Sequence, residues 1–329
     1  MIEQSLEKLE PTIQVIEKRF GKESIMILGN VDKTKVSTFS SGSISLDYIL
    51  GINGFPKGRI IEIFGPESSG KTTIALHAIS EIQKNGGIAA FIDVEHSIDP
   101  VYAKNLGVDI DKLVLSQPNS GEEALEIVDI LAKSGCIDLI IVDSVAALVT
   151  ESELQGDMKD QTIGSQARLM SKALRKITSN LYKNKTTIIF INQIREKVGL
   201  VFGNNETTSG GRALKFYSSI RIDVRKISSI SVNDSIIGNI IKMKVVKNKL
   251  AALFKSATTE IIFSKGISRI SEMVDLAEQH NIFQKKGSWY SYKDKNIAQG
   301  KNNLKALLES SQQIYDEINL EIKQILGSK

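Results

Sequence analysis

The chain has 329 residues, of which 41% are hydrophobic and 24% charged, and its formal net charge is +4. This composition is ordinary for a globular protein and excludes a chain too polar to build a core. The net charge is too small to indicate a nucleic-acid partner, because only clustered positive charge would do so.

A single cysteine, Cys136, rules out an intramolecular disulfide and a cysteine-based zinc site, which suits a reducing compartment. Residues 1–24 lack the basic start and the apolar run of a secretion signal. No apolar run reaches the roughly 18 residues that a membrane-spanning helix needs. We therefore expect a cytoplasmic protein.

Residues 2–20 carry apolar side chains at spacings of three and four, which predicts an amphipathic helix. Pro11 should kink this helix or split it in two. Because the apolar face has no partner nearby in the sequence, the helix must dock on the core or on another subunit. We assign residues 1–32 to an N-terminal oligomerisation segment.

From residue 42 onward, short apolar runs alternate with helical segments, a pattern typical of βαβ units and a mainly parallel sheet. The runs are residues 59–64, 88–92, 112–115, 136–142 and 186–192, and the helices between them include residues 72–84 and 121–133, which end near glycines. After residue 216, period-two segments predict antiparallel strands that extend the same sheet. We assign residues 33–265 to this core.

Residues 266–329 form a small module, with helical patterns at both ends and an aromatic, lysine-rich segment between them. Its last helix should run from about residue 302 to residue 326. The predicted fold class is therefore α/β, with a mainly parallel, twisted central sheet, an N-terminal helix and a small α+β C-terminal domain.

Residues 65–72 satisfy the phosphate-loop pattern G-x-x-x-x-G-K-[ST] and lie between a predicted strand and a predicted helix. The glycines let backbone N–H groups converge on phosphate oxygens, and the helix N-terminus adds positive potential. Lys71 should reach the β and γ phosphates, and Thr72 should hold magnesium. The sequence thus predicts a site for ATP and Mg²⁺ formed by Gly65, Pro66, Glu67, Ser68, Ser69, Gly70, Lys71 and Thr72.

Three polar residues follow the ends of predicted core strands, at the edge of the sheet that faces the nucleotide. Asp143 should organise magnesium through water, and its alternative role is that of a helix-capping aspartate. Glu95 should polarise the water that attacks the γ phosphate, with Asp93 as the competing general base. Gln193 is a candidate nucleotide sensor, because an amide can hydrogen-bond a terminal phosphate and move when that phosphate leaves. A strand-end glutamine can also be merely solvated.

Residues 194–213 form a long glycine-rich connection, and such a loop inside a compact core is usually functional or disordered. Phe202 and its apolar neighbours would wedge between stacked bases while Arg195, Lys197 and Arg212 meet phosphates. A partner-binding or simply packed loop is the alternative.

A second loop, residues 151–166, is acidic, and its case for DNA contact rests on Arg168 and Arg175, which follow it on a helix. A solvated helix face is the alternative. In the C-terminal module, the lysines among residues 284–305 surround Trp289 and two tyrosines, which suits an electrostatic funnel for DNA. We predict exposed lysines and a largely structural Trp289.

The motifs GPESSGKTT, FIDVEH, LIIVDSVAAL, FINQIR, FGNNETTSGGRALKFY and KVVKNK follow one another in this order. In order and spacing they resemble the bacterial RecA recombinase family over nearly the whole chain. The resemblance implies a P-loop ATPase of the RecA type that polymerises on single-stranded DNA, pairs it with homologous double-stranded DNA and promotes self-cleavage of LexA-type repressors.

Further site residues follow from the resemblance alone. Lys247 and Lys249 would reach across a subunit interface to the γ phosphate of a neighbour's ATP. Asp99 and Tyr102 match residues that contact adenine, and the N-terminal helix matches a segment that docks on the adjacent subunit. The matching motifs also place Thr73 in the nucleotide site, Gly210 and Gly211 in a DNA loop, and residues 266–329 in a duplex-binding domain.

The chain departs from the family pattern at Leu253, where proline is usual, and at Arg212, where asparagine is common. It also ends without an acidic tail, which should weaken self-inhibition of duplex binding because no mobile anion competes for the lysines near Trp289. Two other functions would use the same nucleotide residues: a ring helicase of the same core fold, and a nucleotide-gated DNA-binding scaffold. The glycine-rich loop and the docking helix favour filaments over rings, and Glu95 argues against a scaffold.

Overall fold

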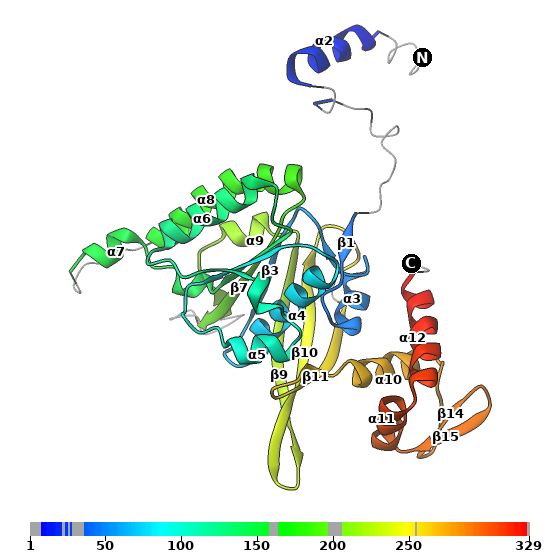
Figure 1. The fold of residues 1–329 in the computed structure, drawn as a ribbon. Coiled ribbons are helices and arrows are strands. Elements are labelled where there is room, and N and C mark those ends of the chain that lie inside the picture. Colours follow the sequence, from blue (N-terminus) through cyan, green and yellow to red (C-terminus); the bar gives the residue numbers. More distant parts are fainter. Residues whose placement is uncertain are drawn as a thin grey trace. The chain divides into compact units, whose positions relative to one another are not determined.

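Figure 1 shows the computed structural model of the protein, which describes residues 8–21, 24, 25, 27, 36–157, 164–196, 206–253 and 255–327. The chain forms two compact units, Met1–Ser37 and Thr38–Lys329. In the first unit, helix α2 (Glu10–Phe20) has Pro11 in its first turn and buries none of its residues. The missing N–H of proline costs nothing in a first turn, so Pro11 is compatible with the start of this helix. Residues 2–7 of the expected helix lie outside the described residues, so a kink or split at Pro11 stays a prediction.

The second unit is built around a large mixed sheet with the order β12-β11-β10-β9-β3-β7-β6-β4-β5, to which β8 is added beside β7. Pairing is parallel from β9 through β3, β7, β6 and β4 to β5, and antiparallel from β9 through β10 and β11 to β12. The strands are β3 (Ile60–Gly65), β4 (Ala89–Asp93), β5 (Val114–Ser116), β6 (Leu139–Asp143), β7 (Thr187–Glu196), β8 (Glu206–Thr208), β9 (Ile220–Val232), β10 (Ser235–Asn248), β11 (Ser256–Ile262) and β12 (Gly266–Ile267). The predicted α/β class, with a parallel core extended by antiparallel strands, is confirmed.

Alternate residues of the strands enter two apolar cores, one on each face of the sheet. In β3, Ile61 and Ile63 pack in the core that includes α4 (Lys71–Lys84). Ile60 points to the other core, with residues of α6 (Gly121–Ser134) and α8 (Ser165–Asn184). A parallel strand buried on both faces has no polar side, which explains why these runs are continuously apolar in the sequence.

Shorter helices lie in the connections between these longer elements (Figure 1). The helices are α3 (Ile44–Leu50), α5 (Pro100–Asn105), α7 (Glu151–Gln155) and α9 (Ala213–Tyr217), with two 3₁₀ turns at Ile110–Lys112 and Val145–Ala147 among the described residues. Strands β1 (Thr38–Phe39) and β2 (Phe55–Pro56) form a small separate sheet. No helix within the described residues is long and apolar enough to cross a bilayer.

The C-terminal module is built around a third apolar cluster, which also takes in Ile44 of α3. It consists of α10 (Arg269–Gln279), a three-stranded sheet of β13 (Gln284–Lys286), β14 (Trp289–Tyr292) and β15 (Lys295–Gln299), and helices α11 (Lys301–Ser310) and α12 (Gln312–Gly327). The single final helix expected over residues 302–326 is wrong, because the chain leaves helical geometry at Ser311. This break lets Leu304 of α11 and Ile318 of α12 both reach the same cluster.

Trp289 is not the structural aromatic residue that we expected. Its side chain is 43% exposed, whereas Tyr290 and Tyr292 are 1% and 8% exposed. The β14 strand therefore turns its tyrosines into the cluster and its tryptophan toward solvent.

A buried carboxylate joins the C-terminal module to the rest of the second unit, and a part-buried histidine holds β12, the strand that precedes the module. Glu272 of α10 accepts hydrogen bonds from Ser43 Oγ at 2.5 Å and from Ile44 N at 2.8 Å, at the N-terminus of α3. His77 Nε2 of α4 accepts one from Ile267 N at 3.0 Å. Burial raises the pKa of Glu272 to about 7 and lowers that of His77 to about 4. The expected boundary at residue 266 stays a prediction.

Candidate active site

The loop of residues 65–72 joins β3 to α4, as the sequence predicts. Gly65 has no room for a side chain, since a Cβ atom would lie 2.0 Å from the carbonyl oxygen of Val224. Gly70 caps α4 with φ 92°, a conformation that glycine adopts at no steric cost. The first helical residue is Lys71, so the free N–H groups of the helix start inside the loop. This geometry can hold phosphate oxygens.

A cavity of about 470 Å³ opens beside this loop. Ser68, Ser69, Gly70, Lys71, Thr72, Thr73 and Tyr102 line one side of it, and Lys226, Asn239, Ile241, Ile261 and Phe263 line the other. The second group comes from the antiparallel strands and from the residue after β11, and sequence reasoning missed it because no local motif marks these positions. Asn239 Oδ1 is buried without a hydrogen-bond partner in the described part of the chain, so it is free to bind a ligand.

Thr72, in the first turn of α4, contacts Asp143 at the end of β6. Thr72 Oγ1 donates a hydrogen bond to Asp143 Oδ2 at 2.7 Å, although the two residues lie on different elements. Burial raises the pKa of Asp143 to about 6 against the effect of this hydrogen bond. A buried carboxylate beside a hydroxyl group offers the hard oxygen ligands that Mg²⁺ prefers, so the predicted magnesium residues fit the ion.

Lys71 points back into the loop, where its Nζ donates a hydrogen bond to the carbonyl oxygen of Pro66 at 2.6 Å. Burial lowers the pKa of Lys71, while Asp143, Glu95 and Glu67 oppose that change. These three carboxylates therefore lie close enough to Lys71 to stabilise its positive charge. A bound phosphate would replace the carbonyl as the partner of the ammonium group.

Glu95 and Gln193 are brought together by two parallel strands. Glu95 follows β4, Gln193 lies on β7, and Gln193 Nε2 donates a hydrogen bond to Glu95 Oε1 at 3.1 Å. Ser144 Oγ also donates to Glu95 Oε1. Glu95 is exposed toward solvent, as a residue that polarises water must be.

Asp93, the competing general base, is fully buried. Its carboxylate accepts hydrogen bonds from Ser97 N at 3.1 Å, Ile98 N at 3.3 Å and Gln117 Nε2 at 3.0 Å. These contacts hold the turn after β4, so Asp93 has a structural task and Glu95 is the better candidate.

Tyr102 lies on α5 and lines the cavity, and Asp99 immediately precedes this helix. Asp99 caps this helix by accepting hydrogen bonds from Val101 N and Tyr102 N at 2.8 Å and 3.2 Å. The hydroxyl group of Tyr102 pairs with Thr73 Oγ1 at 2.9 Å. Tyr102 therefore lines the nucleotide cavity, whereas Asp99 fixes the helix that carries it.

Lys247 and Lys249 lie at the opposite edge of the sheet. Asn248 between them pairs with Ile220, which pairs with Ile61 near the start of β3, whereas the phosphate loop begins where β3 ends. Within one protomer, these lysines therefore do not reach the loop of their own chain.

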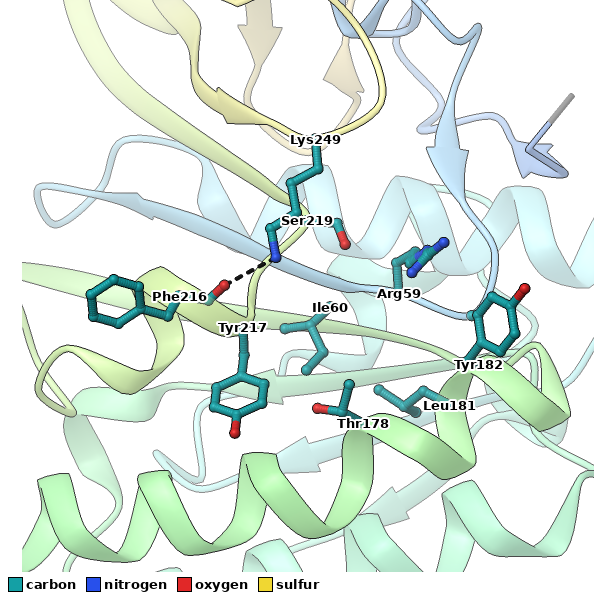
Figure 2. A pocket seen from close by; sticks show the side chains of 10 residues that line it. Arg59, Ile60, Thr178, Leu181, Tyr182, Phe216, Tyr217, Ser219 and Lys249 are labelled. Atoms are coloured by element: carbon teal, nitrogen blue, oxygen red, sulfur yellow. Dashed lines mark hydrogen bonds between the residues drawn. The ribbon is translucent and has the colours of Figure 1, made fainter. Parts of the chain in front are cut away.

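The two ammonium groups converge on α9. Lys247 Nζ donates to the carbonyl oxygens of Lys215 and Phe216 at 2.5 Å and 3.0 Å, and Lys249 Nζ donates to that of Phe216 at 3.1 Å. Burial, Lys249 and Arg221 lower the pKa of Lys247 to about 8. Figure 2 shows Lys249 beside a cavity of about 300 Å³, which Phe216, Tyr182 and Arg59 also line.

The glycine-rich turn before α9 packs against the start of α8. Gly210 N donates a hydrogen bond to Gln166 Oε1 at 3.1 Å. Both Gly210 and Gly211 have positive φ angles, of 80° and 76°, and a Cβ atom on Gly211 would lie 2.7 Å from Ala167 Cβ. The turn thus needs glycine for its backbone conformation and for its close approach to the helix.

Arg212 directly follows this turn, Arg168 follows Ala167 at the start of α8, and Arg175 lies about two helical turns further along α8. Arg168, Arg175 and Arg212 are exposed, and Arg195 Nε donates to Ser209 Oγ at 3.0 Å. The other two candidates, Lys197 and Phe202, lie outside the described residues. Among the described residues, the end of one segment that the sequence singled out therefore contacts the end of the other, at Gln166 and Gly210.

Several lysines of the C-terminal module, which we expected to be available to DNA, form ion pairs within the protein. Four of them pair with carboxylates: Lys285 with Glu278, Lys293 with Glu317, Lys301 with Asp275, and Lys305 with Glu260. The first three pairs are at the surface and are weak, so phosphate groups can compete for Lys285, Lys293 and Lys301. Lys305 is partly buried and bonds to both oxygens of Glu260 at 2.8 Å.

Known proteins resemble this chain over almost its full length. A family model described as RecA N-terminal domain matches residues 7–268, and one described as RecA C-terminal domain matches residues 271–327. Protein RecA of Mycoplasma mobile is 68% identical over 322 residues, which are 98% of this chain and 97% of that protein. Protein RecA of Mycoplasmopsis pulmonis is 69% identical over 94% of this chain and 91% of that protein, and Protein RecA of Macrococcus caseolyticus is 55% identical over 97% and 90%.

Proposed function

This chain belongs to the RecA family, and we propose that residues 65–72, Glu95, Asp143 and Gln193 form the site at which it hydrolyses ATP. Family membership makes the protein an ATP-dependent DNA strand-exchange recombinase and a DNA-dependent ATPase that binds DNA and forms filaments. Its relatives favour this function over a ring helicase or a scaffold without turnover.

The proposed roles follow the geometry of the site. The N–H groups of the loop and Lys71 bind the β and γ phosphates. Glu95 takes a proton from the attacking water. Magnesium, when held by Thr72 and through water by Asp143, neutralises negative charge on the β and γ oxygens. Tyr102 and Asn239 contact the base or the ribose from opposite sides of the cavity.

One observation carries the proposal: the hydrogen bond from Gln193 to Glu95. Gln193 is three residues before the end of β7, and Arg195 follows on the same strand. The general base is therefore linked directly to the strand that leads into the DNA-facing loop. Contact of DNA with Arg195 on this strand would move Gln193 and thereby position Glu95, which couples DNA binding to hydrolysis.

The neighbouring protomer supplies Lys247 and Lys249 in this proposal. Their place at the opposite edge of the sheet from the phosphate loop is what a head-to-tail assembly requires. A phosphate anion would displace the carbonyl groups of α9 as the partner of Lys247. The positive charge would then stabilise the γ phosphate as an arginine finger does.

The DNA contacts are also proposals. Single-stranded DNA binds where Arg168, Arg175, Arg195, Arg212 and the turn at Gly210 and Gly211 meet, together with Lys197 and Phe202. Duplex DNA binds the C-terminal module, residues 266–329. A LexA-type repressor is the expected protein partner of the filament.

Glu95→Gln tests the assignment of the site. Nucleotide binding and filament formation on single-stranded DNA should persist, while DNA-stimulated hydrolysis should fall by about 10²–10⁴-fold. Electron microscopy of this variant with ATP should show open helical filaments. Undiminished turnover would refute the role of Glu95, and closed rings in place of filaments would contradict the proposed assembly.

A further inference from the structure

Glu62 is a buried carboxylate with no task in the nucleotide site. It lies in β3, before the phosphate loop, and its side chain is 0% exposed. Asn192 Nδ2 donates a hydrogen bond to Oε1 at 3.0 Å, and Arg221 Nε donates one to Oε2 at 2.5 Å. Burying an ion pair brings little stability compared with apolar packing, so its presence calls for another explanation.

The ion pair continues into a row of charges across three strands. Glu62 of β3 pairs in register with Arg221 of β9, and Arg221 pairs in register with Lys247 of β10. Residues paired in this way direct their side chains to the same face of a sheet. The negatively charged Glu62 and the positively charged Arg221 and Lys247 therefore lie side by side on three neighbouring strands. Lys247 is the lysine assigned to the neighbour's ATP.

The charge of Lys247 depends on this row. Arg221 and Lys249 lower its pKa in addition to the effect of burial, and Glu62 is the carboxylate that opposes them. In α9, Lys247 donates hydrogen bonds only to uncharged backbone carbonyl oxygens, those of Lys215 and Phe216. Without Glu62, two neighbouring cations would act on Lys247 with no carboxylate against them.

Asn192 connects the row to the other edge of the sheet. Its Oδ1 accepts a hydrogen bond from Gln193 N at 2.9 Å, and its Nδ2 donates a second bond to the carbonyl oxygen of Ser209 at 3.0 Å. Gln193 in turn contacts Glu95. A continuous set of polar contacts thus runs from the residues around a protomer's own nucleotide to Glu62.

We propose that Glu62 is a positioning residue for ATP hydrolysis at the subunit interface. It orients Arg221 and keeps Lys247 protonated for the neighbouring nucleotide. Through Asn192, it also ties that lysine to the strand that carries the nucleotide sensor of its own protomer. This inference rests on the proposed role of Lys247.

Glu62→Gln tests the inference, because glutamine keeps the size of the side chain and removes its charge. We would measure kcat and KM for ATP in the presence of single-stranded DNA between about pH 6.5 and 9.5. Activity should fall on the alkaline side as Lys247 loses its proton. In Glu62→Gln the midpoint of this fall should move to lower pH by about one unit, with kcat affected more than KM.

Asp129→Asn is the matched control. Asp129 is also a buried carboxylate, 2% exposed, and pairs with Lys133 at 2.6 Å and Lys176 at 2.8 Å, far along the chain from the row. This variant should lose stability without moving the alkaline midpoint. An unmoved midpoint in Glu62→Gln, with kcat lowered equally at every pH, would leave Glu62 a purely structural role and overturn the inference.

Lys247→Arg provides a test that does not require Glu62→Gln to fold. Arginine keeps its charge throughout this pH range, so the alkaline fall should disappear. An alkaline fall that persists would overturn the inference.

Lys247→Ala distinguishes the role of Lys247 from the role of Glu62. Full turnover in Lys247→Ala would refute the role of the lysine itself, whereas an inactive Lys247→Ala with an unmoved Glu62→Gln midpoint would refute only the role of Glu62.

Discussion

Replacement of Glu272 by glutamine should change how the stability of the protein depends on pH. Burial raises the pKa of this carboxyl group from 4.5 to about 7. The folded protein therefore holds the proton at a pH where the unfolded chain has released it, and stability falls as pH rises from 4.5 to about 7. A difference of this size corresponds to about 3 kcal/mol of unfolding free energy.

Glutamine at position 272 keeps one acceptor oxygen for Ile44 N, and its amide NH₂ group can donate to Ser43 Oγ, but it does not titrate. Between pH 4.5 and pH 8, the wild type should therefore lose about 3 kcal/mol more stability than Glu272→Gln. Urea unfolding can be followed by the fluorescence of Trp289, the single tryptophan of the chain, which lies in the same C-terminal module. Buried acids elsewhere, such as Asp47, titrate in both proteins and cancel from the difference.

Glu278→Gln on the same helix controls for the loss of a carboxylate, since Glu278 is at the surface and pairs with Lys285. Its pH dependence should follow the wild type. If Glu272→Gln and the wild type lose stability in parallel across this pH range, the carboxylate is not the titrating group that we infer, and the reasoning from burial fails.

Four other predictions follow from the structure. Lys71→Ala should abolish DNA-stimulated ATP hydrolysis, measured as phosphate release, and turnover at the wild-type rate would refute the phosphate site. Gly65→Ala should weaken nucleotide binding, measured by titration, because its Cβ atom would meet the carbonyl oxygen of Val224 at 2.0 Å. Filament assembly with ATP near pH 8 should take up protons, because a phosphate anion raises the pKa of Lys247 from about 8. Calorimetry in buffers of different ionisation enthalpy would detect this proton uptake. Assembly without proton uptake would argue against a contact between Lys247 and the γ phosphate. Glu317→Gln should free Lys293 and steepen the salt dependence of duplex binding by about one unit in the logarithmic slope, whereas an unchanged slope would exclude Lys293 from the duplex site.

The residues at the ends of parallel strands were predictable from the sequence. Asp143 is the last residue of β6, Glu95 comes two residues after β4, and Gln193 follows the apolar part of β7, which continues to Glu196 and so does not end before Gln193 as expected. The carboxyl ends of parallel strands share one edge of a sheet. Asp143, Glu95 and Gln193 therefore come together without any long-range information beyond strand order. The choice of Glu95 over Asp93 needed the structure, because only the hydrogen bonds of Asp93 reveal that it is fully occupied.

The other wall of the nucleotide cavity was not predictable in this way. Asn239, Ile241 and Ile261 lie on antiparallel strands far along the chain, and their places depend on the register between β9, β10 and β11. Register is set by packing and turn geometry rather than by a local motif. The same limit applies to Trp289, where composition indicates a core aromatic residue but the pleat of β14 selects its neighbours.

The position of Lys247 and Lys249 constrains how protomers can assemble. In the proposed site, one protomer supplies the phosphate loop from the carboxyl edge of its parallel strands and the lysines from the opposite edge. A twofold dimer would bring identical edges together and could not complete the site, since its interface is self-complementary. Only a head-to-tail contact joins one edge to the other, and each added protomer then completes the ATP site of the one before it while leaving a new half-site open. In this proposal, growth along DNA and the formation of active sites are the same event, and a contact of this kind that does not close on itself produces a helical filament.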